Sequence, residues 1–258
     1  MSITIRKYEN RHPLLGRHVR HDSRSLEFPF PTADLHIKSV VHARHIPILD
    51  QVAGSCTANA GIGNLATTPL FEALPLKLDY TLDEPGALQL YSDEETLDGD
   101  GPYPPNDFGS DGLTCAKVLK AHGLISAYQH CFDARSALLA LSVTPFMFGT
   151  DWTTTMFSPD ADGRVHPKGN VEGGHEILCR EYDAEKERLW LDNSWGLAWG
   201  LNGRFYLTLK DFEHLLKRDG DIVILLPLQG LPSSPTAMRR RRRFHHHHHG
   251  EFTPIQGT

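Results

Sequence analysis

The sequence lacks the long hydrophobic runs that membrane proteins and secreted precursors carry. It has no run of about eighteen apolar residues, so it predicts no helix that spans a bilayer. Residues 1–21 are polar and basic and contain no apolar core, which is not typical of a secretory signal peptide. We therefore expect no signal peptide and no membrane partner.

Cysteine is scarce, and no pair of cysteines is closely spaced. The four cysteines are Cys56, Cys115, Cys131 and Cys179. Without a CxxC motif they indicate free thiols in a reducing compartment, although a Cys115–Cys131 disulfide stays open. Gly174-His175-Glu176 begins like a zinc-protease helix, but the fourth residue after His175 is a cysteine and no HExxH motif exists. We expect no metal and no other cofactor.

Positive charge is also scarce over most of the chain. Residues 231–258 carry five arginines and one glutamate, so they contribute +4 to a net charge of −6 and leave −10 on the rest. An acidic body argues against a nucleic-acid groove on the folded part. The tail contains Arg239–Arg243 and His245–His249, and we expect it to be disordered and able to bind anionic surfaces.

The secondary-structure signals divide the chain into a helical part and a strand-rich part. Residues 1–45 are rich in Arg, His and Pro and predict an extended arm over the body. Helix starts follow near Ser55, Asp111 and Asp133. Strand patterns cover 146–148, 177–182, 188–192, 204–209 and 221–226, with a short helix at 211–217. The pattern predicts an α+β fold with a mainly helical lobe at 46–142, a β lobe at 143–230 and the tail at 231–258.

Cys56 has the local sequence expected of a reactive thiol. Ser55 can cap a helix whose first turn contains Cys56, and the partial positive charge at a helix N-terminus favours a thiolate. A protonated His175 would favour it further. We therefore expect a thiolate–imidazolium pair suited to acyl transfer, with the Cys56 amide and the side chain of Gln51 as oxyanion donors.

A hairpin can bring His175 to Asn193. If residues 177–182 and 188–192 pair as antiparallel strands, His175 falls opposite Asn193 or Ser194, within side-chain reach. The Asn193 oxygen can then accept from one ring nitrogen and leave the other for the nucleophile. Each residue alone is also typical of a structural role, as a buried cysteine, a strand histidine or a turn asparagine. Their order along the chain favours the chemical interpretation.

Three segments resemble the papain-like cysteine peptidases. Residues 193–203, NSWGLAWGLNG, match the NSWGxxWGxxG segment of that family, and Gly174-His175 and Gly54-Ser55-Cys56 match its histidine and nucleophile regions. The start GSCTANA is more similar to bacterial and phage-encoded members. Over residues 46–226 the resemblance implies two lobes, a helical lobe packed against an antiparallel β-barrel-like lobe, with the site in the cleft.

The resemblance also implies roles for individual residues. Cys56 would be the nucleophile, His175 the base, Asn193 its orienting partner and Gln51 an oxyanion donor. Trp195 would shield the histidine–asparagine contact. The residues expected around a protein or peptide substrate are Gly54, Ser55, Gly112 and Gly174, with 109–112 as the strip that lines the cleft.

Several residues depart from the family pattern. Gln51 precedes Cys56 by five residues instead of six, and Thr57 replaces a tryptophan. Ala53 stands where secreted members carry a disulfide cysteine, which favours a reducing environment. Glu176 replaces a small residue and is expected to raise the pKa of His175. No long inhibitory pro-segment is expected.

The sequence therefore predicts a cysteine endopeptidase in the cytoplasm or in a virion. Two alternatives remain. One is a catalytically inactive papain-like module with a binding or structural role in a virion or another assembly, which the departures at Gln51 and Thr57 favour. The other is a peptidoglycan amidase that uses Cys56 and His175, which the NSWG segment disfavours.

Overall fold

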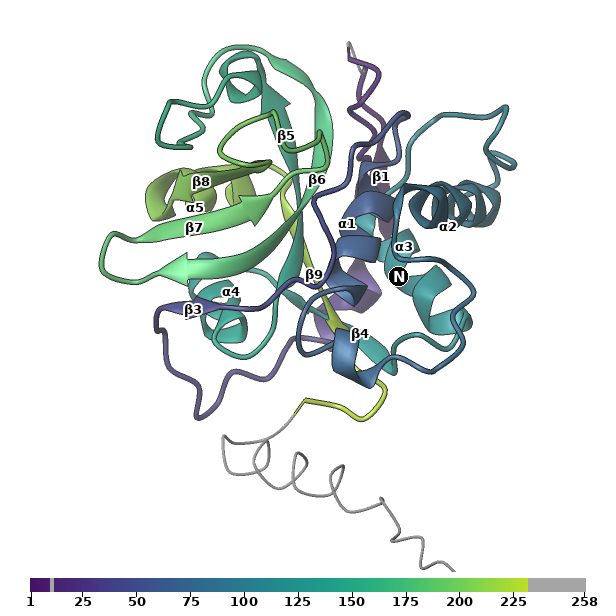
Figure 1. The fold of residues 1–258 in the computed structure, drawn as a ribbon, viewed down its shortest axis with the longest axis horizontal. Coiled ribbons are helices and arrows are strands. Elements are labelled where there is room, and N and C mark those ends of the chain that lie inside the picture. Colours follow the sequence, from purple (N-terminus) through teal and green to yellow (C-terminus); the bar gives the residue numbers. More distant parts are fainter. Residues whose placement is uncertain (10–11, 232–258) are drawn as a thin grey trace, which may run out of the picture.

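The structure, a computed structural model, describes residues 1–9 and 12–231. The predicted tail at 231–258 thus lies, from residue 232 on, outside the described residues. Figure 1 shows three helices gathered on one side of the molecule and the long strands on the other. The three helices are α1 (Cys56–Leu65), α2 (Glu84–Leu97) and α3 (Gly112–Ala121), and each packs against the other two.

Seven of the strands in the described residues form one antiparallel sheet in the order β4-β9-β5-β6-β7-β8, with β3 also paired to β6. Their bounds are β3 (Val40–Val41), β4 (Ala127–Cys131), β5 (Phe146–Thr153), β6 (Val171–Asp183), β7 (Arg188–Asp192), β8 (Arg204–Thr208) and β9 (Asp221–Leu226). Within the described residues the outer strands β4 and β8 do not pair. The prediction of an α+β fold is confirmed, and within the described residues the antiparallel sheet does not close into a barrel.

The central strands are buried on both faces because a separate core packs against each face. On β5, Phe146 and Phe148 enter one core and Met147 enters the other. On β9, Ile222 enters the same core as Phe146 and Phe148, and Val223 enters the same core as Met147. Successive strand residues point to opposite faces, so these strands are continuous apolar runs in the sequence instead of alternating ones.

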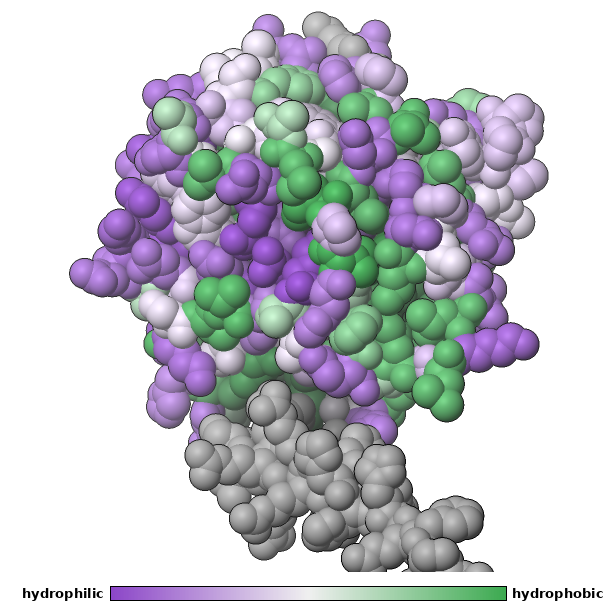
Figure 2. All heavy atoms as spheres, viewed as in Figure 1, coloured by the Kyte–Doolittle hydropathy of each residue, from purple (hydrophilic) through white to green (hydrophobic). Residues whose placement is uncertain are grey.

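The remaining elements pack around this frame. Helices α4 (Ala134–Leu141) and α5 (Leu209–Lys217) cover the strands on the side away from α1, and short 3-10 turns occur at η1 (Ser23–Glu27), η2 (Phe71–Ala73) and η3 (Thr154–Phe157). On the face in Figure 2, the turn between β6 and β7 is hydrophilic, whereas apolar residues gather toward the helices. None of the helices in the described ranges has the length and apolar character that a bilayer crossing requires.

The sequence signals located three helix starts and missed a fourth. Asp111 and Asp133 cap α3 and α4, each accepting a hydrogen bond from the amide of the third residue of its helix. Helix α2 was not predicted because its apolar residues are not segregated on one face. Its start signal is nevertheless present, since Asp83 accepts from the Gly86 amide and Pro85 occupies the first turn.

The predicted arm forms a hairpin before it reaches the body. Strands β1 (Ile3–Arg6) and β2 (Val19–Asp22) pair with each other and join no other strand among the described residues. All four residues of β1 are exposed. The hairpin is therefore attached through its second half, through the residues that precede β2 and through the hydrogen bond from Arg6 to Asp219, not through a core of its own.

Asp192, at the end of β7, is a buried anchor for the strand-rich side. Its carboxylate accepts from Arg180 at 2.7 Å, from Arg204 at 2.6 Å and from Arg44 at 3.1 Å, and it is 3% exposed. Burial opposes the charge, but the three guanidinium groups outweigh it and hold the pKa of Asp192 below its ordinary value. This cluster fixes the end of β7, from which Asn193 follows.

We predict that Asp192→Ala lowers the free energy of unfolding by about 3–5 kcal/mol, because it leaves three guanidinium groups without their shared carboxylate. Urea denaturation at pH 7 measures the change. Since folding lowers the pKa of Asp192, its contribution is present at pH 7 and is lost as the pH falls below the ordinary value of 3.8. The control is Glu185→Ala in the exposed β6–β7 turn, for which we expect less than about 0.5 kcal/mol. Equal effects of the two substitutions would contradict the anchor.

Candidate active site

Cys56 is the first residue of α1 and is fully buried against β6. The main-chain amide of Glu176 hydrogen-bonds its sulfur, so the thiol lies beside the residue that follows His175. Ser55 occupies the cap position as predicted, but its hydroxyl donates to Asn59 at 2.7 Å and does not cap the helix. Helix α1 therefore positions the sulfur through its packing on the sheet rather than through a side-chain cap.

His175 lies on β6 and contacts Asn193, as the hairpin predicted. Its Nε2 is 2.7 Å from Asn193 Oδ1, and within the described part of the chain its buried Nδ1 has no hydrogen-bond partner. The strand register is one residue from the expected one, with Leu178 opposite Asp192 and a bulge nearer the turn. Asn193 thus occupies one ring nitrogen and leaves the other for chemistry.

Two tryptophans enclose the imidazole. The ring centroid of Trp195 is 4.8 Å from that of His175, and Trp152 meets the same ring edge-on at 4.9 Å. Trp195 thus lies where a shield of the His175–Asn193 contact would lie. Trp152, fully buried at the end of β5, was not among the predicted site residues, because only strand pairing brings β5 beside His175.

The side chain of Gln51 is fixed at both ends. Its oxygen accepts from the Ser194 hydroxyl at 2.6 Å, and its nitrogen donates to the carbonyls of Ala53 at 2.8 Å and Leu14 at 3.0 Å. The five-residue spacing to Cys56 still brings Gln51 beside the NSWG segment. The side-chain amide of Gln51 thus points to the carbonyl of Leu14, a residue of the arm.

The arm crosses the site as an extended peptide. The Gly16 amide hydrogen-bonds the Cys56 sulfur. The Ser110 amide donates to Gly16 O at 2.9 Å, His18 N donates to Ser110 O at 2.7 Å, and Arg17 N donates to Gly174 O at 3.1 Å. Of the predicted cleft residues, Gly109, Ser110 and Gly174 therefore lie along this peptide. The expectation of no long inhibitory pro-segment stays a prediction, although a short stretch of the arm covers the thiol in this structure.

Glycines allow this close crossing. A Cβ on Gly16 would lie 1.9 Å from Gly54 O, and one on Gly174 would lie 2.3 Å from Arg17 O. The predicted cleft residue Gly54 also donates its amide to Asp107 at 3.0 Å. Any side chain at these positions would force the two backbones apart.

Gly112 serves a different neighbour. A Cβ there would lie 2.6 Å from Oε1 of Glu176, so this predicted cleft residue makes room for a buried carboxyl group and not for the arm itself. Glu176 is 1% exposed, and burial raises its pKa well above the ordinary value.

The covered thiol and imidazole are both uncharged at neutral pH. Burial, reinforced by the nearby Glu176 carboxyl, raises the pKa of Cys56 to about 12, although two amides act in the opposite direction. Burial lowers the pKa of His175 to about 4, only partly offset by Asn193. The predicted thiolate–imidazolium pair is therefore absent while the arm is in place, and the expectation that Glu176 raises the pKa of His175 is wrong.

A second buried carboxyl group lies below the start of α1. Glu94 of α2 accepts from the Thr57 hydroxyl at 3.0 Å, and burial raises its pKa well above the ordinary value. Thr57, which departs from the family pattern, thus ties the nucleophile helix to α2. Sequence reasoning missed Glu94 together with its helix. In residues 1–9 and 12–231, no three His, Cys, Asp or Glu side chains are grouped to hold a metal ion.

The fold is similar to those of known cysteine proteases. No family model and no curated protein sequence matches the chain. Xylellain, a cysteine protease from Xylella fastidiosa, superposes with a TM-score of 0.65 at 20% identity over 86% of this chain and 98% of that one. Digestive procathepsin L 3 of Tenebrio molitor gives 0.52 at 15% identity over 76% and 72%. The proform of the ragweed pollen allergen Amb a 11, also a cysteine protease, gives 0.54 at 14% identity over 76% and 68%. The chain therefore has the papain-like fold.

Proposed function

We propose that the protein is a latent cysteine peptidase that hydrolyses peptide bonds through Cys56. The single observation that carries this proposal is the peptide already lying across the thiol. Gly16–His18 runs extended past Cys56 and exchanges main-chain hydrogen bonds with Ser110 and Gly174. A groove that binds an extended backbone beside a thiol and an imidazole suits a peptide substrate.

In the proposed reaction, the Cys56 proton passes to Nδ1 of His175, and the sulfur bonds to the carbonyl carbon of the substrate. The carbon–nitrogen bond then breaks, and the amine leaves with the proton from His175 while a thioester remains. Water adds to the thioester, its proton returns through His175 to the sulfur, and the acid is released. Asn193 would hold the ring, and the Cys56 and Gln51 N–H groups would face the oxyanion.

In this proposal the peptidase is latent because its thiol and its imidazole are both uncharged. The arm keeps water away from the thiol, and burial holds Cys56 and His175 in their neutral forms. Departure of the arm would return water to the site, so that the charged pair costs less to form. The two proforms among the similar structures are compatible with a covered state of this fold.

We predict that Gly16→Ala makes Cys56 more reactive. The added methyl group would overlap Gly54 O, so the arm segment must leave its path across the site. Each unit by which the pKa of the thiol falls raises the thiolate fraction tenfold, and we expect iodoacetamide to alkylate Cys56 at least about ten times faster at pH 7.5. Peptide mass mapping identifies the modified cysteine.

Glu27→Ala provides the matched control, since Glu27 belongs to the same arm and is solvent-exposed. It should alkylate at the rate of the unmodified chain. An unchanged rate for Gly16→Ala, with the fold intact by circular dichroism, would show that the arm does not govern access to the sulfur.

We predict that Cys56→Ala, introduced into the Gly16→Ala chain, abolishes peptide cleavage. An epoxysuccinyl inhibitor should label the Gly16→Ala chain at Cys56 and should fail to label the double variant. Cys131→Ala in the same background should keep both activities, because Cys131 is a buried thiol on β4 outside the site. Cleavage that persists without Cys56 would refute the proposal.

The alternative is a catalytically inactive module with the same fold, which the neutral state of Cys56 and His175 favours. The same experiment separates it from a peptidase. If Gly16→Ala frees the sulfur for alkylation but cleaves no peptide, the inactive module is the better description.

A further inference from the structure

Arg17 of the arm fills a pocket in the body. Its side chain is fully buried, and its Nη2 donates to Asp221 at 2.8 Å and to the carbonyl of Asp219 at 2.6 Å. Its Nη1 donates to the hydroxyl of Tyr8, another arm residue, at 2.8 Å. A buried guanidinium requires a site that supplies opposite charge and hydrogen bonds, and here the body supplies the charge.

Two carboxyl groups and two glycines form this pocket. A Cβ on Gly149 would lie 2.6 Å from Asp221 Oδ1, 2.6 Å from Glu176 Oε2 and 2.7 Å from Arg17 Nε. A Cβ on Gly112 would lie 2.6 Å from Glu176 Oε1. Both glycines thus leave the space in which the carboxyl groups and the guanidinium meet. All four pocket residues belong to the body and would stay if the arm left.

The arm arginine does not use the full hydrogen-bonding capacity of the pocket. Among the described residues, neither oxygen of Glu176, nor Oδ1 of Asp221, nor Nε of Arg17 has a hydrogen-bond partner, although all four atoms are buried. Buried polar atoms are rarely left unpaired. A guanidinium that enters from another backbone position could bond to atoms that Arg17 does not reach.

The pocket opens beside the reacting groups. Glu176 directly follows His175 on β6, and its amide hydrogen-bonds the sulfur of Cys56. Arg17 directly follows Gly16, whose amide reaches the same sulfur. A peptide that crosses the thiol therefore delivers a side chain to this pocket from a residue close to the one at the sulfur.

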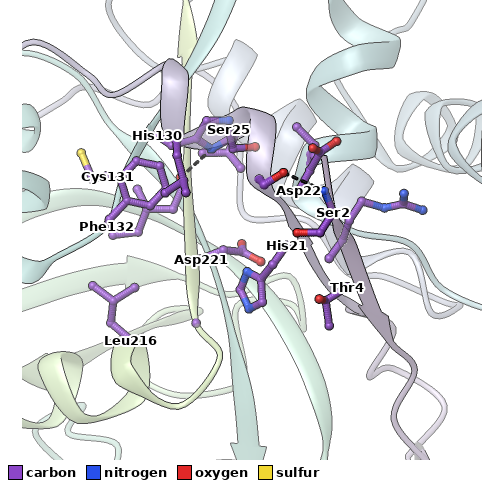
Figure 3. A pocket seen from close by; sticks show the side chains of 17 residues that line it. Ser2, Thr4, His21, Asp22, Ser25, His130, Cys131, Phe132, Leu216 and Asp221 are labelled. Carbon is purple, nitrogen blue, oxygen red and sulfur yellow. Dashed lines mark hydrogen bonds between the residues drawn. The ribbon is translucent and has the colours of Figure 1, made fainter.

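The outer side of the pocket adjoins the arm hairpin. A cavity of about 370 Å³ lies between the hairpin and the body, and Asp221 lines it. Figure 3 shows Asp221 around this space with Ser2, Thr4 and His21 of the hairpin. The Asp221 side chain is 18% exposed, whereas Glu176 is enclosed. Departure of the hairpin would open the Asp221 side of the pocket to solvent.

We propose that this pocket, formed by Glu176, Asp221, Gly149 and Gly112, selects an arginine side chain of the substrate close to the cleaved bond, and that Arg17 occupies it as a stand-in. The proposal rests on the peptidase function proposed above. Arginine is favoured over lysine because a planar guanidinium can bond to two carboxyl groups at once. An apolar or acidic side chain would leave the carboxyl groups buried without a partner.

The test uses the full-length Gly16→Ala, Arg17→Ala chain, in which the arm can neither cross the thiol nor fill the pocket. Peptides that carry arginine, lysine, citrulline or leucine at one position are compared by mass spectrometry of their cleavage products. We expect arginine to be preferred. Asp221→Asn should reduce the arginine-to-leucine ratio about 30-fold or more, since it removes the charged partner of a buried guanidinium.

Glu176→Gln should reduce the same ratio, whereas Glu172→Gln, on the same strand but bonded to Thr154, should leave it unchanged. Melting temperatures identify any variant that fails to fold. The pocket assignment is overturned if the cleavage ratio does not favour arginine over leucine, or if Asp221→Asn leaves that ratio unchanged in a folded chain. In either case the proposed peptidase activity would remain supported by the cleavage itself.

A second readout does not depend on turnover. The peptide HPLLGRHV, the sequence of residues 12–19, is added while Cys56 of the Gly16→Ala, Arg17→Ala chain is alkylated. The slowing of alkylation is compared with that given by a copy of the peptide that carries citrulline in place of Arg17. Stronger protection by the arginine peptide, lost in Asp221→Asn, supports the pocket even if no peptide is cleaved, in which case the proposed function alone fails. Equal protection by both peptides overturns the pocket.

Discussion

The contact between the first turn of α1 and strand β6 is the one on which the site depends. It brings a sulfur from the helical side to the residue after an imidazole on the strand side. Every residue of α1 is buried, and Gly61 allows α1 to pack closely on α3, since a Cβ there would lie 2.6 Å from the sulfur of Cys115. Larger residues on α1 would move Cys56 away from β6 even if Cys56 itself were unchanged.

The same close packing explains why helix position alone does not ionise the thiol. A helix N-terminus and two amides favour the thiolate of Cys56, but full burial and the carboxyl of Glu176 outweigh them. The charge state of the site is therefore set by what covers it. A covering peptide that brings its own cation to Asp221 and Glu176 offsets part of the cost of burying these carboxyl groups.

Local sequence relationships predicted much of the site, and long-range ones did not. The helix that starts at Cys56 and the contact between His175 and Asn193 follow from local signals between neighbouring residues, even though Ser55 does not cap the helix and the hairpin register is one residue from the expected one. Glu94 was missed because its helix has no segregated apolar face. The arm crosses residues about 90 to 160 positions away, and Arg17 pairs with Asp221 204 positions away, which no periodicity or turn signal encodes.

The carboxamide of Gln51 has one proton bound within the body and one bound to the arm. Ala53 and Ser194 hold the group from behind, and only the Leu14 carbonyl is lost if the arm leaves. That departure would expose a single N–H already aimed into the groove, with no rotation of the side chain needed. If the protein is the latent peptidase proposed above, the covered form would thus keep its proposed oxyanion donor in the orientation that the reaction needs, bonded to a carbonyl oxygen as it would be in a substrate complex.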